Sequence, residues 1–166
     1  ESCGGVVQGL NGTIESPGFP HGYPNYANCT WLIITGERNR IQLTFVTLAL
    51  EEDFDIVSVY DGQPSPGNLK MRLIPRKRSL CLQGSGPADV TLSGFMLPSP
   101  IVSSGSILAL WFTTDFAVSA QGFKAVYEGK MTCDGVAGPS EQITLTLNVP
   151  ENRNILWKPY EALERP

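Results

Sequence analysis

Histidine is almost absent from this 166-residue chain, and its placement argues against an enzyme. His21 is the single histidine, it lies between Pro20 and Gly22, and no nucleophile-elbow motif accompanies it. One histidine and four dispersed cysteines also lack the closely spaced ligand pairs of a zinc site. We therefore expect no catalytic activity.

Charge and long apolar runs are scarce as well. Only 17% of the residues are charged and the formal net charge is −4, so the chain lacks the dominant basic surface of a nucleic-acid-binding protein. No apolar run approaches the roughly 20 residues that cross a bilayer. The sequence opens with Glu1-Ser2-Cys3 and has no signal-peptide apolar stretch there. We expect neither a nucleic-acid partner nor a membrane span in this chain.

Glycine and proline are abundant, with 17 and 13 residues, and this composition favours short strands joined by turns over long helices. Strand-like alternation or apolar enrichment marks residues 30–34, 40–48, 56–60, 106–113, 122–127 and 142–149. We therefore predict an all-β sandwich or jelly roll with little helix.

Three stretches have no clear strand pattern. Residues 10–28 contain many turn formers, so we expect an irregular segment there. Residues 64–106 are rich in Gly, Pro and Ser and carry a lone Cys81. The region after residue 149 is charged and contains proline, which indicates a mostly flexible end with a short helical stretch near 160–164.

Two chemical signs indicate an extracellular protein. The chain has four cysteines and two Asn-x-Thr glycosylation acceptors, at Asn11 and Asn28. Either asparagine alone is also an ordinary turn residue, since such tripeptides arise often by chance. Together with a disulfide, the two acceptors predict a secreted protein or the ectodomain of a membrane protein.

The order of landmarks resembles a CUB domain over about residues 3–128, most like those of the CUB and sushi multiple-domain proteins. The landmarks are Cys3-Gly4-Gly5, Ser16-Pro17-Gly18-Phe19-Pro20, Tyr23-Pro24-Asn25-Tyr26, Cys29-Thr30-Trp31, Asp55-Ile56-Val57-Ser58-Val59-Tyr60-Asp61-Gly62 and Phe112-Thr113-Thr114-Asp115. The resemblance implies a jelly-roll β-sandwich of two antiparallel sheets and an extracellular recognition role.

The resemblance also implies a disulfide between Cys3 and Cys29, and it exposes departures from the family pattern. The second disulfide of many CUB domains is excluded because the neighbourhood of Phe54 has no cysteine. Residues 74–92 look like an inserted loop, and residues 129–166 like a divergent, partly flexible tail that lacks the further cysteines of a sushi domain. Cys81 and Cys133 can pair with each other, pair between chains or stay free.

An acidic run, residues 51–55, is the candidate metal site. In calcium-binding CUB domains three acidic residues supply the core ligands, and by motif these positions are Glu51, Asp55 and Asp115, with the backbone carbonyl of Ala117 as an addition. Calcium prefers such oxygen ligands, and three clustered carboxylates repel one another without a cation between them. The alternative is a solvated acidic loop, which is how we interpret the neighbouring Glu52 and Asp53.

These observations predict a noncatalytic, calcium-dependent protein-interaction module, and the resemblance implies a link to complement control or cell adhesion. The resemblance implies that a carboxylate of the calcium site, with an aromatic residue such as Tyr26 beside it, accepts a Lys or Arg of the partner; Tyr26 fits a packing role equally well. The alternative is a calcium-independent adhesin that binds glycans or polyanions. The basic run from Arg76 to Arg78 suits a polyanion contact, a protease cleavage site or a soluble loop.

Overall fold

The computed structural model describes residues 2–76, 89–93 and 96–131, and nearly all of its regular structure is β-strand. One short 3-10 turn, η1, covers Pro66–Asn68. The strands are β1 (Gly4–Gln8), β2 (Asn11–Glu15), β3 (Asn28–Ile34), β4 (Asn39–Ala49), β5 (Ile56–Asp61), β6 (Leu69–Arg76), β7 (Asp89–Ser93), β8 (Ile101–Val102), β9 (Ile107–Thr113) and β10 (Gly122–Met131).

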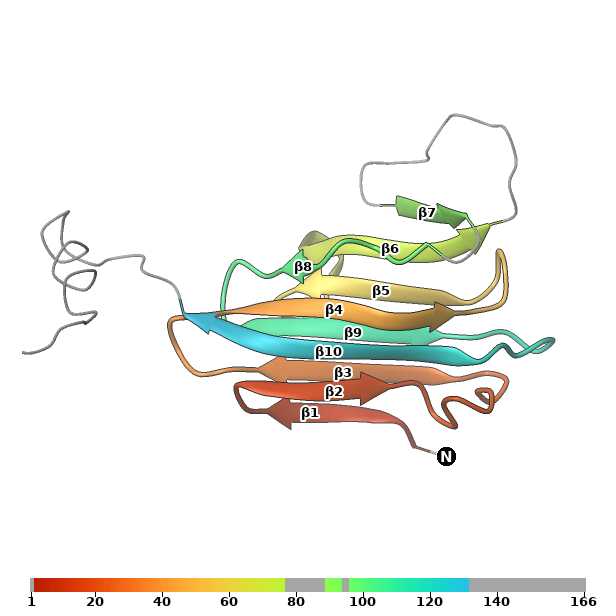
Figure 1. Ribbon diagram of the computed structural model, residues 1–166, viewed down its shortest axis with the longest axis horizontal. Helices are drawn as coiled ribbons and strands as arrows, with labels where there is room; N and C mark the ends of the chain where they lie inside the picture. The colour runs from red at the N-terminus through yellow and green to blue at the C-terminus, as the bar shows by residue number, and fades with distance from the viewer. Residues whose placement is uncertain (1, 77–88, 94–95, 132–166) are drawn as a thin grey trace, which may run out of the picture. The chain divides into compact units, whose positions relative to one another are not determined.

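The strands form two sheets, as the predicted sandwich requires. One sheet has six strands in the order β1-β3-β9-β5-β6-β7, and the other has four in the order β2-β10-β4-β8. Most pairs are antiparallel, whereas β1–β3 and β6–β7 are parallel. The longest pairing joins β4 and β10 from Gly122 opposite Ala49 to Met131 opposite Asn39. Figure 1 shows the strands of both sheets lying along one common axis, with their arrows pointing both ways. The all-β, jelly-roll prediction is confirmed.

Alternating apolar residues build the core between the sheets. Along β4 the inward residues are Ile41, Leu43 and Phe45, and all three are buried. An aromatic cluster then joins the sheets: Phe123 of β10 lies edge-on to Phe112 of β9, with ring centroids 5.2 Å apart. It also meets Trp31 at 5.7 Å and Phe45 at 6.0 Å. Packing across the gap therefore fixes the face that each strand buries.

The structure corrects three sequence-based expectations. Residues 10–28 are not irregular throughout, because Asn11–Glu15 pairs with β10 and buries Ile14. Within residues 64–106 lie β6, β7 and β8, and both ends of the predicted 74–92 loop are therefore strand. Residues 129–131, assigned to the tail, continue β10 alongside β4. In each case the segment forms a strand because it pairs with a strand distant in sequence, although its composition does not suggest one.

Several predictions lie outside the described residues. They include the pairing of Cys81 and Cys133, the centre of the predicted insertion, the basic run beyond Arg76, and the strand and helix proposed within residues 142–164. None of the helices in the described part is long and apolar enough to cross a membrane.

Candidate metal centre

Three loops meet at one end of the sandwich, and two of them bring the acidic residues of the predicted site. The β4–β5 loop carries Glu51 and Asp55, the β9–β10 loop carries Asp115, and the β2–β3 loop lies beside them (Figure 1). One carboxylate oxygen from each of these three acids lies within 4.8 Å of the others. The structure therefore brings together the three carboxylates that were predicted from positions up to 64 residues apart (115 − 51).

Asp55 is the fixed member of the group. It is fully buried just before β5. The Tyr23 hydroxyl donates a short hydrogen bond to Oδ2, and the Asp115 backbone N–H donates to Oδ1 at 3.2 Å. Burial and the hydrogen bond to the Asp55 carboxylate both raise the pKa of Tyr23, so its hydroxyl keeps its proton. The carboxylate of Asp55 is thus held in one orientation.

Tyr23 connects this end of the molecule to the core. Its ring packs edge-on against Phe112, with centroids 5.2 Å apart, and its hydroxyl accepts the backbone N–H of Glu51 at 2.9 Å. The same oxygen therefore positions two of the three acidic residues. Sequence reasoning identified Tyr23 only as a family landmark; its place three residues before Tyr26 gave no signal of this role.

Among the residues that the structure describes, Glu51 is the member with an unsatisfied carboxylate oxygen. Its Oε2 atom is buried and has no hydrogen-bond partner within the described part of the chain. Desolvation raises the pKa of Glu51, and the negative charge of Asp115 raises it further. A buried carboxylate oxygen without a donor is costly unless a cation approaches it.

Asp115 is partly exposed and is held through its own loop. Its Oδ1 accepts the backbone N–H of Ala117 at 3.0 Å, and its backbone carbonyl accepts the N–H of Tyr26 at 2.8 Å. Ala117 was predicted to offer its carbonyl to the metal. The contact seen here is instead made by its amide, so ligation by the Ala117 carbonyl stays a prediction.

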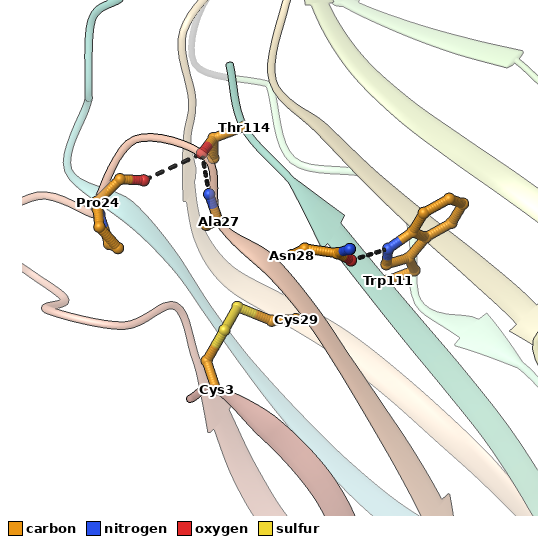
Figure 2. Close-up of a disulfide and its surroundings, with 7 residues drawn as sticks. All are labelled: Cys3, Pro24, Ala27, Asn28, Cys29, Trp111 and Thr114. Atoms are coloured by element: carbon orange, nitrogen blue, oxygen red, sulfur yellow. Dashed lines mark hydrogen bonds between the residues drawn. A yellow bond between two sulfur atoms is a disulfide. The ribbon is translucent and has the colours of Figure 1, made fainter. Parts of the chain in front are cut away.

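Thr114 fastens the β9–β10 loop to the β2–β3 loop (Figure 2). Its hydroxyl accepts the Ala27 N–H at 2.8 Å and donates to the Pro24 carbonyl at 3.0 Å. Asn25 adds a bond from its amide to the Phe116 carbonyl at 2.8 Å. These bonds make the end of the sandwich a connected surface before any ligand binds.

The predicted disulfide lies next to these loops. Cys3 and Cys29 are bonded with their Cα atoms 5.0 Å apart, and the bridge ties the start of the chain to β3 (Figure 2). The disulfide prediction is confirmed.

Comparison with known proteins shows which family the chain belongs to. Residues 3–80 match the family model described as the CUB domain. The chain contains a CUB domain.

Two relatives show the extent of the similarity. Rat neuropilin-2 (Rattus norvegicus) is 36% identical over 137 residues, which is 76% of this chain and 13% of neuropilin-2. Human cubilin (Homo sapiens) is 33% identical over 147 residues, 85% of this chain and 4% of cubilin. The chain thus spans a small part of the curated relatives that it matches. The predicted resemblance to CUB domains is confirmed.

A solved structure agrees with the fold. The MASP-1 CUB2 domain bound to Ca2+ aligns with a TM-score of 0.56 and 20% identity, over 76% of this chain and 98% of that one. CUB domains are modules of extracellular and cell-surface proteins, generally noncatalytic, that mediate protein–protein contacts. His21 is exposed in the β2–β3 loop of this CUB domain.

The acidic group of the CUB domain lies in loops that also carry exposed apolar side chains. Tyr26 is 75% exposed and has a positive φ of 55°, and Phe116 is 66% exposed. Phe54 and Val118 are exposed in the same three loops. Glu52 and Asp53, predicted bystanders, do not belong to the group of approaching carboxylates. Sequence reasoning missed these apolar residues apart from Tyr26.

Proposed function

We propose that this CUB domain is a noncatalytic, calcium-dependent protein-interaction module. The observation that carries the proposal is the approach of Glu51, Asp55 and Asp115, whose ligand oxygens lie within 4.8 Å of one another. The unpartnered Oε2 of Glu51, within the part of the chain that the structure describes, is the independent sign that this group fits a cation.

Calcium matches the donor set by its chemistry. It is a hard cation that takes about six to eight oxygen ligands, several of them carboxylates from loops. Glu51, Asp55 and Asp115 would hold it, with the Ala117 carbonyl and water completing the shell. Asp55 would keep its orientation because Tyr23 and the Asp115 amide already position it. The MASP-1 CUB2 domain, which shares this fold, was solved bound to Ca2+, and this is consistent with the choice of calcium.

We propose that the partner is an extracellular or cell-surface protein that presents a Lys or Arg. A carboxylate oxygen at the edge of the site would accept the basic group through a charge-assisted hydrogen bond. Asp115 is the best placed for this, because it is partly exposed, whereas Asp55 is fully buried and the Oε2 atom of Glu51 is buried as well. Tyr26 and Phe116 would pack against the stem of the basic side chain. A role in complement control or adhesion belongs to the same proposal.

Thermal unfolding in calcium and in chelator tests the metal. Asp115→Asn is a cleaner variant than Asp55→Ala, because removing Asp55 also leaves the Tyr23 hydroxyl without its acceptor. We expect millimolar calcium to raise the Tm of the wild type by about 2 to 8 °C. Asp115→Asn should lose most of that shift.

The matched control is Glu37→Gln, which removes the same charge from the exposed β3–β4 turn at the opposite end of the strands. It should respond to calcium as the wild type does. A wild type whose Tm is the same in millimolar calcium and in chelator would refute the metal site.

Binding to peptides tests the partner. Immobilised peptides with one exposed Lys should capture the wild type in calcium, and matched norleucine peptides should not. Tyr26→Ser should weaken the capture while leaving the calcium shift unchanged. Capture by heparin that persists in chelator and falls steeply with salt would instead favour the polyanion-binding alternative.

A further inference from the structure

A second feature lies on the outer face of the six-stranded sheet, away from the core. The side chain of Asn28, the first residue of β3, meets the indole of Trp111 in β9 (Figure 2). The indole Nε1–H donates to the Asn28 Oδ1 at 2.7 Å. Asn28 is also the acceptor asparagine of the tripeptide Asn28-Cys29-Thr30.

Strand geometry turns the two residues that define the glycosylation tripeptide, Asn28 and Thr30, to the outer face of the sheet. Side chains alternate along β3, so Cys29 faces the core, where it bonds to Cys3, while Asn28 and Thr30 face outward. Thr30 is paired with Trp111, and Asn28 with Thr113. The indole therefore reaches Asn28 as a diagonal neighbour on one sheet face.

The hydrogen bond to Trp111 determines which atom of the Asn28 side-chain amide is available for glycosylation. An indole N–H is only a donor, so the atom that faces Trp111 is the carbonyl oxygen of Asn28 and not its nitrogen. The Nδ2 atom of Asn28 donates no hydrogen bond to the residues that the structure describes, and the side chain is exposed. The reactive nitrogen is thus not used in the hydrogen bond to Trp111.

Trp111 leaves apolar area uncovered next to Asn28. Its side chain is 39% exposed although β9 is a central strand, between β3 and β5. An exposed indole face suits the apolar C–H face of a sugar ring.

We propose that Asn28 carries an N-linked glycan whose first N-acetylglucosamine packs on Trp111. The donor is a lipid-linked oligosaccharide diphosphate of the secretory lumen. A bond forms between Nδ2 and the anomeric carbon of the sugar, the bond from that carbon to the diphosphate oxygen breaks, and one amide proton leaves with the lipid diphosphate. Nothing is oxidised or reduced. Oδ1 is not consumed, so the bond from Trp111 survives and holds the sugar at the indole.

Mass spectrometry of the chain secreted by a mammalian cell line tests occupancy. The wild type should carry a glycan at Asn28 that peptide mapping assigns to the segment containing Trp31. Thr30→Ser keeps the tripeptide and should keep that glycan, whereas Thr30→Ala should lose it and retain the Asn28–Trp111 bond. Thr13→Ala is the matched control, because it removes only the acceptor tripeptide at Asn11. A secreted wild type without sugar at Asn28 would overturn the proposal.

Tryptophan quenching and thermal unfolding test whether the sugar packs on the indole of Trp111. Endoglycosidase H leaves one sugar on the asparagine, and this trimmed wild type is compared with Thr30→Ala. With the Trp111→Phe signal subtracted, acrylamide should quench Trp111 less when the single sugar is present. The Tm of the trimmed wild type should also be about 2 to 4 °C higher than that of Thr30→Ala. The same sugar should raise the Tm by less when Trp111→Phe is present, because phenylalanine offers a smaller ring. Equal quenching of Trp111 with and without sugar would show that the glycan leaves the indole uncovered, and the packing would be wrong.

Discussion

The interior of the sandwich and its acidic loop end differ in how far the protein satisfies its own groups. Between the sheets, Phe112 and Phe123 are fully buried and each faces other rings edge-on. At the loop end, Asp55 is just as buried, but two other carboxylates approach it, and the Glu51 Oε2 has no donor in the described structure. The interior is complete by itself, whereas the loop end carries charge that a cation would compensate.

Tyr23 joins the two regions. Its ring belongs to the core through Phe112, while its hydroxyl belongs to the acidic group through Asp55 and the Glu51 amide. The core therefore supplies the rigidity and the loops supply the charge. It follows that variants of the interior should change stability equally with and without calcium, and variants of the loop end should not.

The largest effect should come from Phe123→Ala. Phe123 contacts rings from both sheets, so truncation leaves a cavity and should lower the free energy of unfolding by about 3 to 5 kcal/mol. Urea titration in calcium and in chelator should give the same loss. Phe123→Leu, which keeps more of the side-chain volume, should cost less than Phe123→Ala. A loss that doubles in calcium would break the separation of the two regions.

Removal of the disulfide should come next. The bridge closes a loop with a sequence separation of 26, so in the chain-entropy picture Cys3→Ser with Cys29→Ser should lower the unfolding free energy by about 3 to 4 kcal/mol. The calcium-induced rise in Tm should persist, because neither cysteine belongs to the acidic group. If the double variant lost its response to calcium, the disulfide would be required for calcium binding at the loop end.

The interior was predictable from sequence because its pattern is periodic. Ile41, Leu43 and Phe45 alternate with polar residues, and the structure buries all three. By contrast, β6 was missed although Leu69, Met71 and Leu73 alternate with Lys70 and Arg72, because the strand lies inside residues 64–106, whose overall composition favours turns. Leu73 is fully buried there, and the strand pairs with β5. A short alternating pattern is therefore easy to overlook when the residues around it favour turns.

The loop end was predictable in part, by family motif and not by periodicity. The motif placed Glu51, Asp55 and Asp115 in one site, and the structure brings them together. Two things could not be read from the sequence: the unpartnered oxygen of Glu51 among the described residues, and the two hydrogen bonds of the Tyr23 hydroxyl. Both depend on side-chain directions that only the packed loops define.

Tyr23→Phe tests the link between the regions. The variant keeps the ring in the core and removes the hydroxyl that donates to Asp55, so the free energy of unfolding should fall by about 1 to 3 kcal/mol. Half-saturation in a calcium titration should also move to higher concentration, because Asp55 is no longer oriented. Tyr127→Phe, at a buried tyrosine of β10 outside the acidic group, is the control and should leave calcium binding unchanged. Unchanged calcium affinity in Tyr23→Phe would mean that the link is structural only.

The smallest effect, with the most informative sign, should come from Glu51→Gln. The raised pKa of Glu51 means that its ionised form is disfavoured in the folded state, so in chelator at pH 7 the neutral glutamine should raise the Tm. That gain should fade as the pH falls from the raised folded-state pKa towards the ordinary glutamate pKa of about 4.3, below which folded and unfolded chains both hold the proton. In calcium the sign should reverse, because the variant loses a charged ligand. The measurement is the Tm of both proteins at pH 4 and pH 7, in chelator and in calcium. If the Tm of Glu51→Gln were lower than that of the wild type by the same amount in all four conditions, Glu51 would contribute to stability as an interior residue does. The contrast between the two regions would then be wrong.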